Sequence, residues 1–301
     1  VVERVKRGLP VPGGIPRALA FSPLVAQPAA TPGYGTVAAR QGDKPDIFVL
    51  SIINWDFRIQ RPQHLATCMA AEGHRVFYIE MDHTLREGTV REVAPGFFVN
   101  MWGYNGQSPG PTIEVVEGDR VRIFVTNRLG EPTSVHWHGI DLPSGFDGVA
   151  GLNQPAIGVG ETYVYEFTLR QHGTHMYHPH ADEMTQMAFG MMGLFIIHPK
   201  AGEEVPVDRD YAFLLHNWAL HPGTYRPDPS VMQDFDLWSF NSKVFPAIDP
   251  LVMRTGERMR IRIGNLSMWN HPIHLHSNPF WVTGSDAGRW PKAQWRREVT
   301  E

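Results

Sequence analysis

Apolar and polar residues alternate along the chain from about residue 100 onward, which is typical of strands with one face in a core. Residues 113–125 form two such runs joined by a Glu-Gly-Asp turn, and residues 251–263 repeat the pattern around another glycine. We therefore expect a mainly β protein with two Greek-key β-sandwich domains, over residues 97–200 and 208–301.

Residues 45–96 have a different pattern, which predicts a small β-α-β unit. IFVLSII and RVFYI are apolar enough to be buried strands, and residues 61–72 between them predict a helix with Pro62 in its first turn. This helix would bury Cys68, so we interpret the cysteine as core packing. Residues 1–44 are rich in proline and glycine, and we expect them to form a flexible leader.

Composition and charge exclude several classes of protein. Hydrophobic residues make up 42% and charged residues 19% of the 301 residues, which is typical of a globular protein. The net charge is -4 and the basic residues form no stripe, which argues against a nucleic-acid partner. No apolar run is long enough to span a membrane. The single cysteine excludes an internal disulfide and a Cys-rich metal site.

Histidines occur in three H-x-H triplets, at 136–138, 178–180 and 274–276. On a strand, residues i and i+2 face the same side, so each triplet directs two imidazoles to one point and turns its apolar middle residue away. Fifteen histidines placed at random would give about 0.7 such triplets. Three triplets therefore indicate metal binding rather than isolated surface or core histidines.

The first and third triplets occupy equivalent places in an internal repeat. The stretches that lead to them match without a gap at a spacing of 138 residues, as His136 does with His274. Two copies of one domain therefore each present a histidine pair. The same spacing would place the counterpart of His178 at position 316, beyond Glu301, so we interpret the second domain as incomplete and the chain as truncated.

The type of ligand limits which metal ions the site could hold. Neutral imidazole suits copper, zinc, iron and nickel, but no carboxylate lies at the spacing of a His/carboxylate iron triad. Zinc hydrolases usually add Glu or Cys ligands. Six histidines from two sandwich domains favour a multinuclear copper cluster.

Four stretches around the histidines carry a family resemblance: YNGQSPGPTIEVVEGDRVRIFVTNRL, SVHWHGIDLPSGFDGV, GTHMYHPHADEMTQMAFGMMGLFIIHP and NHPIHLH. Over about residues 97–301 the chain resembles the multicopper oxidases, laccase-like proteins built from cupredoxin domains. The resemblance implies oxidation of a phenol or metal ion and reduction of dioxygen to water at a trinuclear copper centre, which receives electrons from a separate type 1 copper. It also implies a homotrimer and a periplasmic or extracellular location.

The resemblance assigns copper types to the histidines. The type 2 copper would be held by His136 and His274, and His271 would be a type 1 ligand. The type 3 pair would take the remaining four: His138, His178, His180 and His276.

Three carboxylates are candidates for orienting water and supplying the protons that dioxygen reduction consumes. Asp147 corresponds to the acidic residue that the family places near the type 2 copper, although an Asp-Gly turn explains it equally well. Asp182 and Glu183 follow the second triplet directly, where they could supply protons or simply face solvent. The methionines nearby are interpreted as packing.

Two departures from the family shape the functional hypothesis. The H-C-H segment that would complete the type 3 pair and supply the type 1 thiolate is absent from the 301 residues, so we expect the chain alone not to run the full oxidase cycle. Residues 46–80 resemble instead the opening of certain glycosyltransferases. The alternatives are a non-catalytic protein that binds or sequesters copper and a glycosyltransferase fragment. The sequence does not identify the reducing substrate.

Overall fold

The computed structural model describes residues 46–51, 76–80, 90–276, 278–297 and 299–300. Strands dominate these residues, and the helices among them are short: η3 (Ser144–Phe146) and α2 (Glu183–Ala188). The expected mainly β fold is confirmed. None of the helices in this part of the chain is long and apolar enough to cross a membrane.

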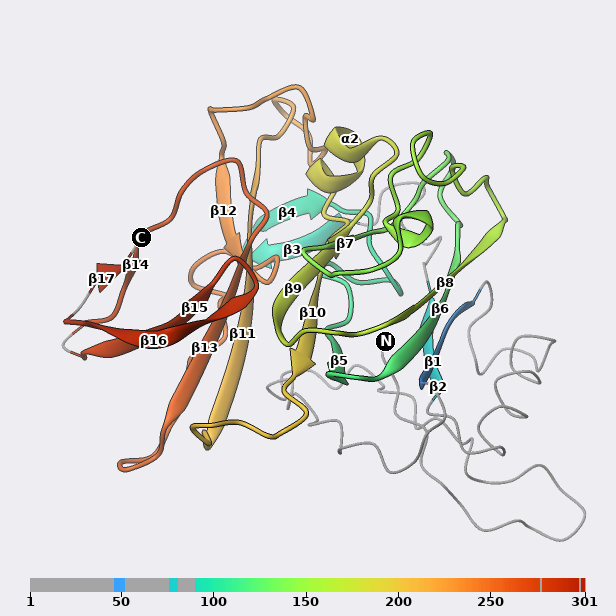
Figure 1. Ribbon diagram of the computed structural model, residues 1–301. Coiled ribbons are helices and arrows are strands. Elements are labelled where there is room, and N and C mark those ends of the chain that lie inside the picture. The colour runs from blue at the N-terminus through green and yellow to red at the C-terminus, as the bar shows by residue number, and fades with distance from the viewer. Residues whose placement is uncertain (1–45, 52–75, 81–89, 277, 298, 301) are drawn as a thin grey trace, which may run out of the picture.

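The first domain is a sandwich of two sheets (Figure 1). One sheet has the order β2-β1-β6-β8 and the other β5-β10-β9-β7. The strands of the first sheet are β1 (Asp46–Ser51), β2 (Val76–Glu80), β6 (Arg120–Thr126) and β8 (Thr162–Thr168). Those of the second are β5 (Ile113–Val116), β7 (His136–His138), β9 (Gly173–His178) and β10 (Gly193–His198).

The alternation read from the sequence accounts for the core between these sheets. Val121, Ile123 and Val125 are buried on the inner side of β6, while Arg120 and Arg122 are at least partly exposed. They pack in one cluster with the buried side chains of the facing sheet, including Phe195. Burial of this alternate set is what fixes the register of each strand.

Strand β10 is buried on both faces. Phe195 and Ile197 belong to the core of the first domain, whereas Leu194 and Ile196 pack against Leu214 of the second domain. A strand covered on both sides needs an uninterrupted apolar run, which explains the sequence LFII.

The N-terminal strands extend the first domain. Strand β1 pairs in parallel with β2 on one side and with β6 on the other. The two strands of the expected β-α-β unit therefore join the sandwich sheet. The expected helix over residues 61–72, Cys68 and the leader over residues 1–44 lie outside the described residues.

A hairpin of β3 (Val90–Ala94) and β4 (Phe97–Asn100) spans the position where we expected a domain boundary, between residues 96 and 97. Val93 and Val99 are buried against Trp218 of the second domain. The two strands of the hairpin thus lie on opposite sides of the expected boundary, and both pack against the second domain.

The second domain contains a three-stranded sheet and two small ribbons. The sheet has the order β12-β11-β13, with β11 (Arg209–Trp218) parallel to β13 (Met259–Asn265) and antiparallel to β12 (Leu237–Phe240). The ribbons pair β15 (Phe280–Ser285) with β16 (Gly288–Arg296), and β14 (Ile273–His274) with β17 (Val299–Thr300).

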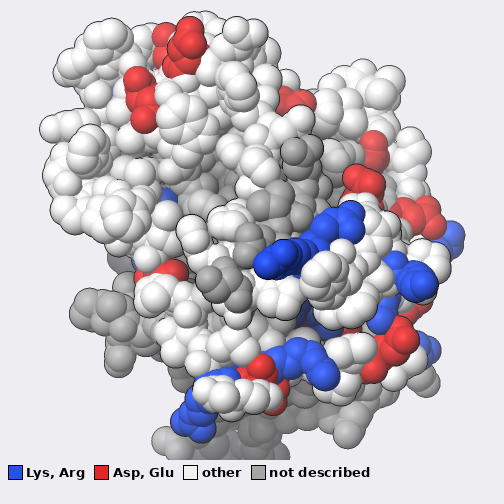
Figure 2. All heavy atoms as spheres, turned by 90° about the vertical axis from the view of Figure 1, so that its left-hand side faces the viewer, with Lys and Arg blue, Asp and Glu red and all other residues white. Residues whose placement is uncertain are grey.

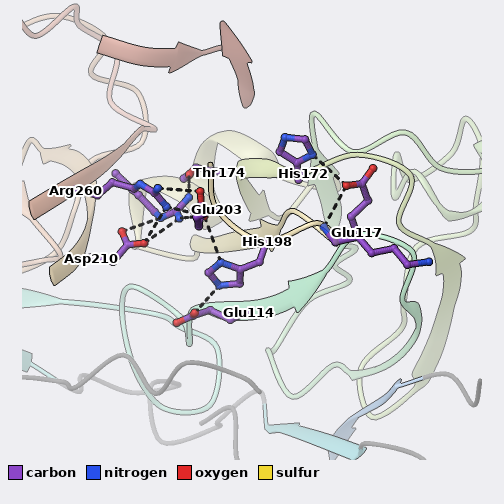
Figure 3. A network of polar contacts seen from close by, with 10 residues as sticks. Glu114, Glu117, His172, Thr174, His198, Glu203, Asp210 and Arg260 are labelled. Atoms are coloured by element: carbon purple, nitrogen blue, oxygen red, sulfur yellow. Dashed lines mark hydrogen bonds and ion pairs between the residues drawn. The ribbon is translucent and has the colours of Figure 1, made fainter. Parts of the chain in front are cut away.

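Charged side chains join the two domains around His198, at the end of β10 (Figure 3). Its Nε2 lies 2.9 Å from Glu114 Oε2 on β5, and its Nδ1 lies 3.9 Å from Glu203 Oε1. Glu114, and after it Glu203, raises the pKa of His198 to about 9. The ion pair with His198, followed by the hydrogen bonds from Arg260, lowers the pKa of Glu203 to about 2.

Two arginines of β13 complete this network from the second domain. Arg260 Nη1 donates to Glu203 Oε1 at 2.7 Å. Arg262 is largely buried and donates to Asp210 on β11 at 2.9 Å and to Thr174 Oγ1 on β9 at 2.8 Å. The domain joint therefore combines the apolar contacts of β10 with a chain of ion pairs.

Candidate metal centre

Two of the predicted histidine pairs meet because their strands are neighbours. Strand β7 pairs antiparallel with β9, and the register places His136 opposite His178. Trp137, between the two histidines of β7, turns into the core and is only 1% exposed. The strand alternation therefore places the imidazoles on one face and anchors the strand on the other.

Three imidazoles form a group that could hold a metal ion. One ring nitrogen of each of His136, His138 and His178 lies within 4.8 Å of the others. His180 lies beside this group, with its ring centroid 5.4 Å from that of His136 and 6.2 Å from that of His178.

Outer hydrogen bonds orient two of these rings. His136 Nδ1 lies 2.6 Å from the carbonyl oxygen of Asp147, and His178 Nδ1 lies 2.9 Å from that of Pro179. A carbonyl only accepts, so each Nδ1 carries the proton and each Nε2 is left with its lone pair. His178 Nε2 lies 3.2 Å from His138 Nδ1. Hydrogen bonds from Nδ1 to a carbonyl oxygen, as in His136 and His178, fix the tautomer and the direction of a metal-binding imidazole.

Burial keeps two of these imidazoles, His138 and His178, in the form that binds metal. Burial, and then the neighbouring His136 and His138, lower the pKa of His178 to about 4. Burial also lowers the pKa of His138. These imidazoles are therefore neutral near pH 7, with a lone pair available for a metal ion.

The three expected carboxylates take different places. Asp147 Oδ1 lies 3.3 Å from His136 Nδ1, and Asn153 Nδ2 donates to its other oxygen at 3.2 Å. Glu183 lies between two histidines, with its carboxylate oxygens 3.6 Å from His178 Nδ1 and 3.5 Å from His180 Nε2. Asp182 instead caps α2, because its side chain accepts a hydrogen bond from the backbone N–H of Thr185.

The histidines of the second domain lie apart from this group. The rings of His274 and His276 are 4.5 Å from each other, and both residues are exposed. Strand β14, which carries His274, lies at the outer margin of the second domain, well away from β7 (Figure 1). His271 Nε2 lies 2.6 Å from Ser267 Oγ. Of the seven predicted ligands, the four from the first domain therefore lie close together, whereas the three from the second domain lie elsewhere.

Sequence reasoning missed Gln186, on α2 directly after the second triplet. Its side chain is completely buried and hydrogen-bonded to Glu131, Pro132 and Thr133. A glutamine among methionines belongs to no motif, and nothing in the sequence marked it.

The donor set fits copper. Imidazole is a preferred ligand of copper ions. The group gathers three imidazoles, two of them oriented by outer hydrogen bonds, with a carboxylate next to His136 and another next to His178.

Comparison with known proteins agrees with this chemistry. Two family models described as multicopper oxidase match residues 89–202 and 222–299. A copper resistance protein A homolog of Pseudomonas syringae pv. tomato is 44% identical over 115 residues, 38% of this chain and 19% of that protein. An L-ascorbate oxidase of Brassica rapa subsp. pekinensis is 43% identical over 119 residues, 38% of this chain and 20% of that protein. The alignments thus span about a fifth of these relatives.

Solved structures extend the likeness to most of the chain. The blue copper oxidase from Nitrosomonas europaea aligns with a TM-score of 0.64 at 30% identity, covering 71% of this chain and 69% of that one. The multicopper oxidase mgLAC aligns with a TM-score of 0.62 at 32% identity, covering 70% and 68%. The cupredoxin-like fold expected from the sequence is therefore confirmed, and the chain belongs to the multicopper oxidase family.

Proposed function

We propose that this chain is a copper-binding part of an oxidase that takes electrons from a small reducing substrate and passes them to dioxygen, forming water. The observation that carries the proposal is the group of His136, His138 and His178 with its outer hydrogen bonds. Bound copper would supply the one-electron redox chemistry that no side chain of this group has. A phenol or a metal ion is the substrate class we propose.

The histidines would divide between copper types as the family motif assigns them. We propose that His136 and His274 hold the type 2 copper and that His271 serves a type 1 site. The type 3 pair would take His138, His178, His180 and His276.

Two carboxylates would handle protons. Reducing dioxygen to water consumes one proton for each electron, so acidic groups must lie near the histidines. Glu183 lies within 3.6 Å of both His178 and His180, and Asp147 within 3.3 Å of His136. We propose these two as the proton-relaying groups, and Asp182 as the helix cap that keeps Glu183 in place.

A second copy of the chain would complete the centre. The pair at His274 and His276 is exposed and lies away from the first-domain group, so neighbouring subunits must meet if both pairs are to serve one site. In the view of Figure 2, a broad area of the surface carries few charged side chains. Trp281 and Trp295 are exposed on the second domain. Exposed aromatic side chains of this kind favour association, and we propose a homotrimer in the periplasm or outside the cell.

A second candidate function is copper binding without catalysis. One observation favours it: the three-histidine group is formed within a single chain and needs no partner. Such a site could bind or sequester copper.

Copper loading combined with oxygen uptake separates the two candidates. The chain is loaded with copper, its metal content and molar mass are measured, and oxygen uptake is followed with a phenol and with a metal-ion reductant. His138→Gln should lower copper content, whereas the control His172→Gln, outside the group, should not. Because we expect the chain alone not to run the full oxidase cycle, the molar mass decides: copper bound by associated copies of the chain, with or without oxygen uptake, supports the oxidase, and copper bound by a single chain without uptake supports sequestration. Absence of copper binding rejects both.

A further inference from the structure

Helix α2 (Glu183–Ala188) follows the His178-Pro179-His180 segment directly and has only six residues. A helix of this length is not stable by itself in water, so tertiary contacts must hold it. The contact it uses is unusual. Its one buried side chain is Gln186, at 0% exposure, while the apolar Met184 is 57% exposed.

The amide of Gln186 is hydrogen-bonded at both ends. Its Nε2 donates to Glu131 Oε1 at 2.8 Å and to the carbonyl oxygen of Pro132 at 2.9 Å. Its Oε1 accepts from Thr133 Oγ1 at 2.6 Å. A buried amide is destabilising unless it is paired in this way, so these contacts select one position of the side chain.

These partners lie just before the first histidine strand. Thr133 is completely buried and precedes His136 by three residues. Gln186 therefore ties the helix that follows the second triplet to the segment that leads into the first.

Glu183 lies on the same side of α2, three residues before Gln186, because residues i and i+3 of a helix are neighbours on its surface. Its carboxylate oxygens lie 3.6 Å from His178 Nδ1 and 3.5 Å from His180 Nε2. Any rotation of α2 about its axis that breaks the contacts of Gln186 also moves Glu183 away from these rings.

We propose that Gln186 is a positioning residue for the histidine group. By holding α2 against residues 131–133, it keeps Glu183 against His178 and His180 and so sets the metal affinity of the group. The metal-affinity part rests on the proposed copper-binding function, whereas the placement of Glu183 does not.

The test uses the full chain and the variant Gln186→Met, which keeps the side-chain length but removes the amide. Met184→Leu, on the exposed side of the same helix, is the matched control. The first readout is metal-free: imidazole signals of His178 and His180 are recorded by NMR with and without Glu183→Gln. We expect Glu183→Gln to shift both signals in the wild-type background and to shift them less than half as much in the Gln186→Met background.

The second readout is Cu²⁺ affinity by competition with a chromogenic chelator. Loss of an outer partner of a metal ligand typically weakens binding 10- to 100-fold, so we expect Gln186→Met to weaken it by about tenfold and Met184→Leu to leave it unchanged. The melting temperature is measured alongside. A lower melting temperature with both readouts unchanged would mean that Gln186 is merely structural, and would overturn the proposal.

The two proposals fail in different ways. If the wild-type chain binds no copper, the function is rejected, while the NMR comparison still decides the placement of Glu183. If Glu183→Gln shifts the signals equally in both backgrounds, the positioning role is rejected. Should Gln186→Met not fold, Thr133→Val, which removes only the hydrogen bond to Oε1, takes its place with the same expected direction.

Discussion

Replacing His198 with glutamine should remove a pH-dependent part of the stability of the domain joint. His198 lies between Glu114, at 2.9 Å, and Glu203, at 3.9 Å, and its side chain is 21% exposed. These carboxylates, Glu114 first, raise its pKa from 6.5 to about 9, against the opposing effects of burial and of Arg262. The imidazolium is thus held by the fold at neutral pH.

The sign and size of the effect follow from this pKa. A group whose pKa is higher in the folded state stabilises that state fully below its unfolded pKa, here 6.5, and loses this contribution as pH rises through about 9. The interval between the two values, at about 1.4 kcal/mol per pH unit, corresponds to at most about 3.5 kcal/mol. His198→Gln should therefore lower the free energy of unfolding by up to about 3.5 kcal/mol near pH 6, and by much less above pH 9.

Urea unfolding of the wild type and His198→Gln at pH 6, 7.5 and 9.5, followed by tryptophan fluorescence, measures this difference. His172→Gln is the control, because His172 pairs with Glu117 at 3.2 Å but both side chains are at least a third exposed. Exposed pairs contribute at most about 1 kcal/mol, so the control should cost little at every pH. If the free energies of unfolding of the wild type and His198→Gln differ by the same amount from pH 6 to pH 9.5, then the ion pairs of His198 do not stabilise the domain joint.

Three further substitutions test the core and the metal site. Trp137→Ala empties a completely enclosed indole site and should lower the free energy of unfolding by about 3–5 kcal/mol in urea titrations; a loss below about 1 kcal/mol would contradict its anchoring role. Gly193→Ala would drive a methyl group into the Tyr177 ring, so we expect a loss of about 1–3 kcal/mol, and an unchanged unfolding midpoint would refute that contact. Asp147→Ala removes the carboxylate beside His136 and should weaken Cu²⁺ binding by about tenfold in chelator competition; equal affinity would show that the backbone carbonyl alone orients the ring.

Local patterns were enough to predict the features of the first domain that depend on strand alternation. The alternate burial of Val121 and Ile123 on β6 and the inward turn of Trp137 follow from the two-residue period of a strand. The meeting of His136 with His178 needed one further step, the antiparallel pairing of β7 and β9. Family motifs supplied the expectation that these histidines share a site.

Features that depend on the packing of distant segments could not be predicted in this way. The parallel pairing of β1 with β6 joins residues more than 70 positions apart, and no local signal selects which distant strand lies beside β1. The separation of His274 from His136 depends on how the domains are oriented. Contacts such as Arg260 with Glu203 contribute to that orientation, and a sequence pattern does not specify them. The role of Gln186 likewise exists only once its three partners are assembled.

The position of β1 also bears on how the molecule avoids aggregation. In the order β2-β1-β6-β8, β1 covers the edge of β6 that faces away from β8. Without it, that edge would present a row of unpaired N–H and C=O groups, which readily recruit strands from other molecules. Within the described residues, the N-terminal unit therefore moves the open edge of this sheet from the seven-residue β6 to the five-residue β2, and a short edge strand offers fewer groups for intermolecular strand addition.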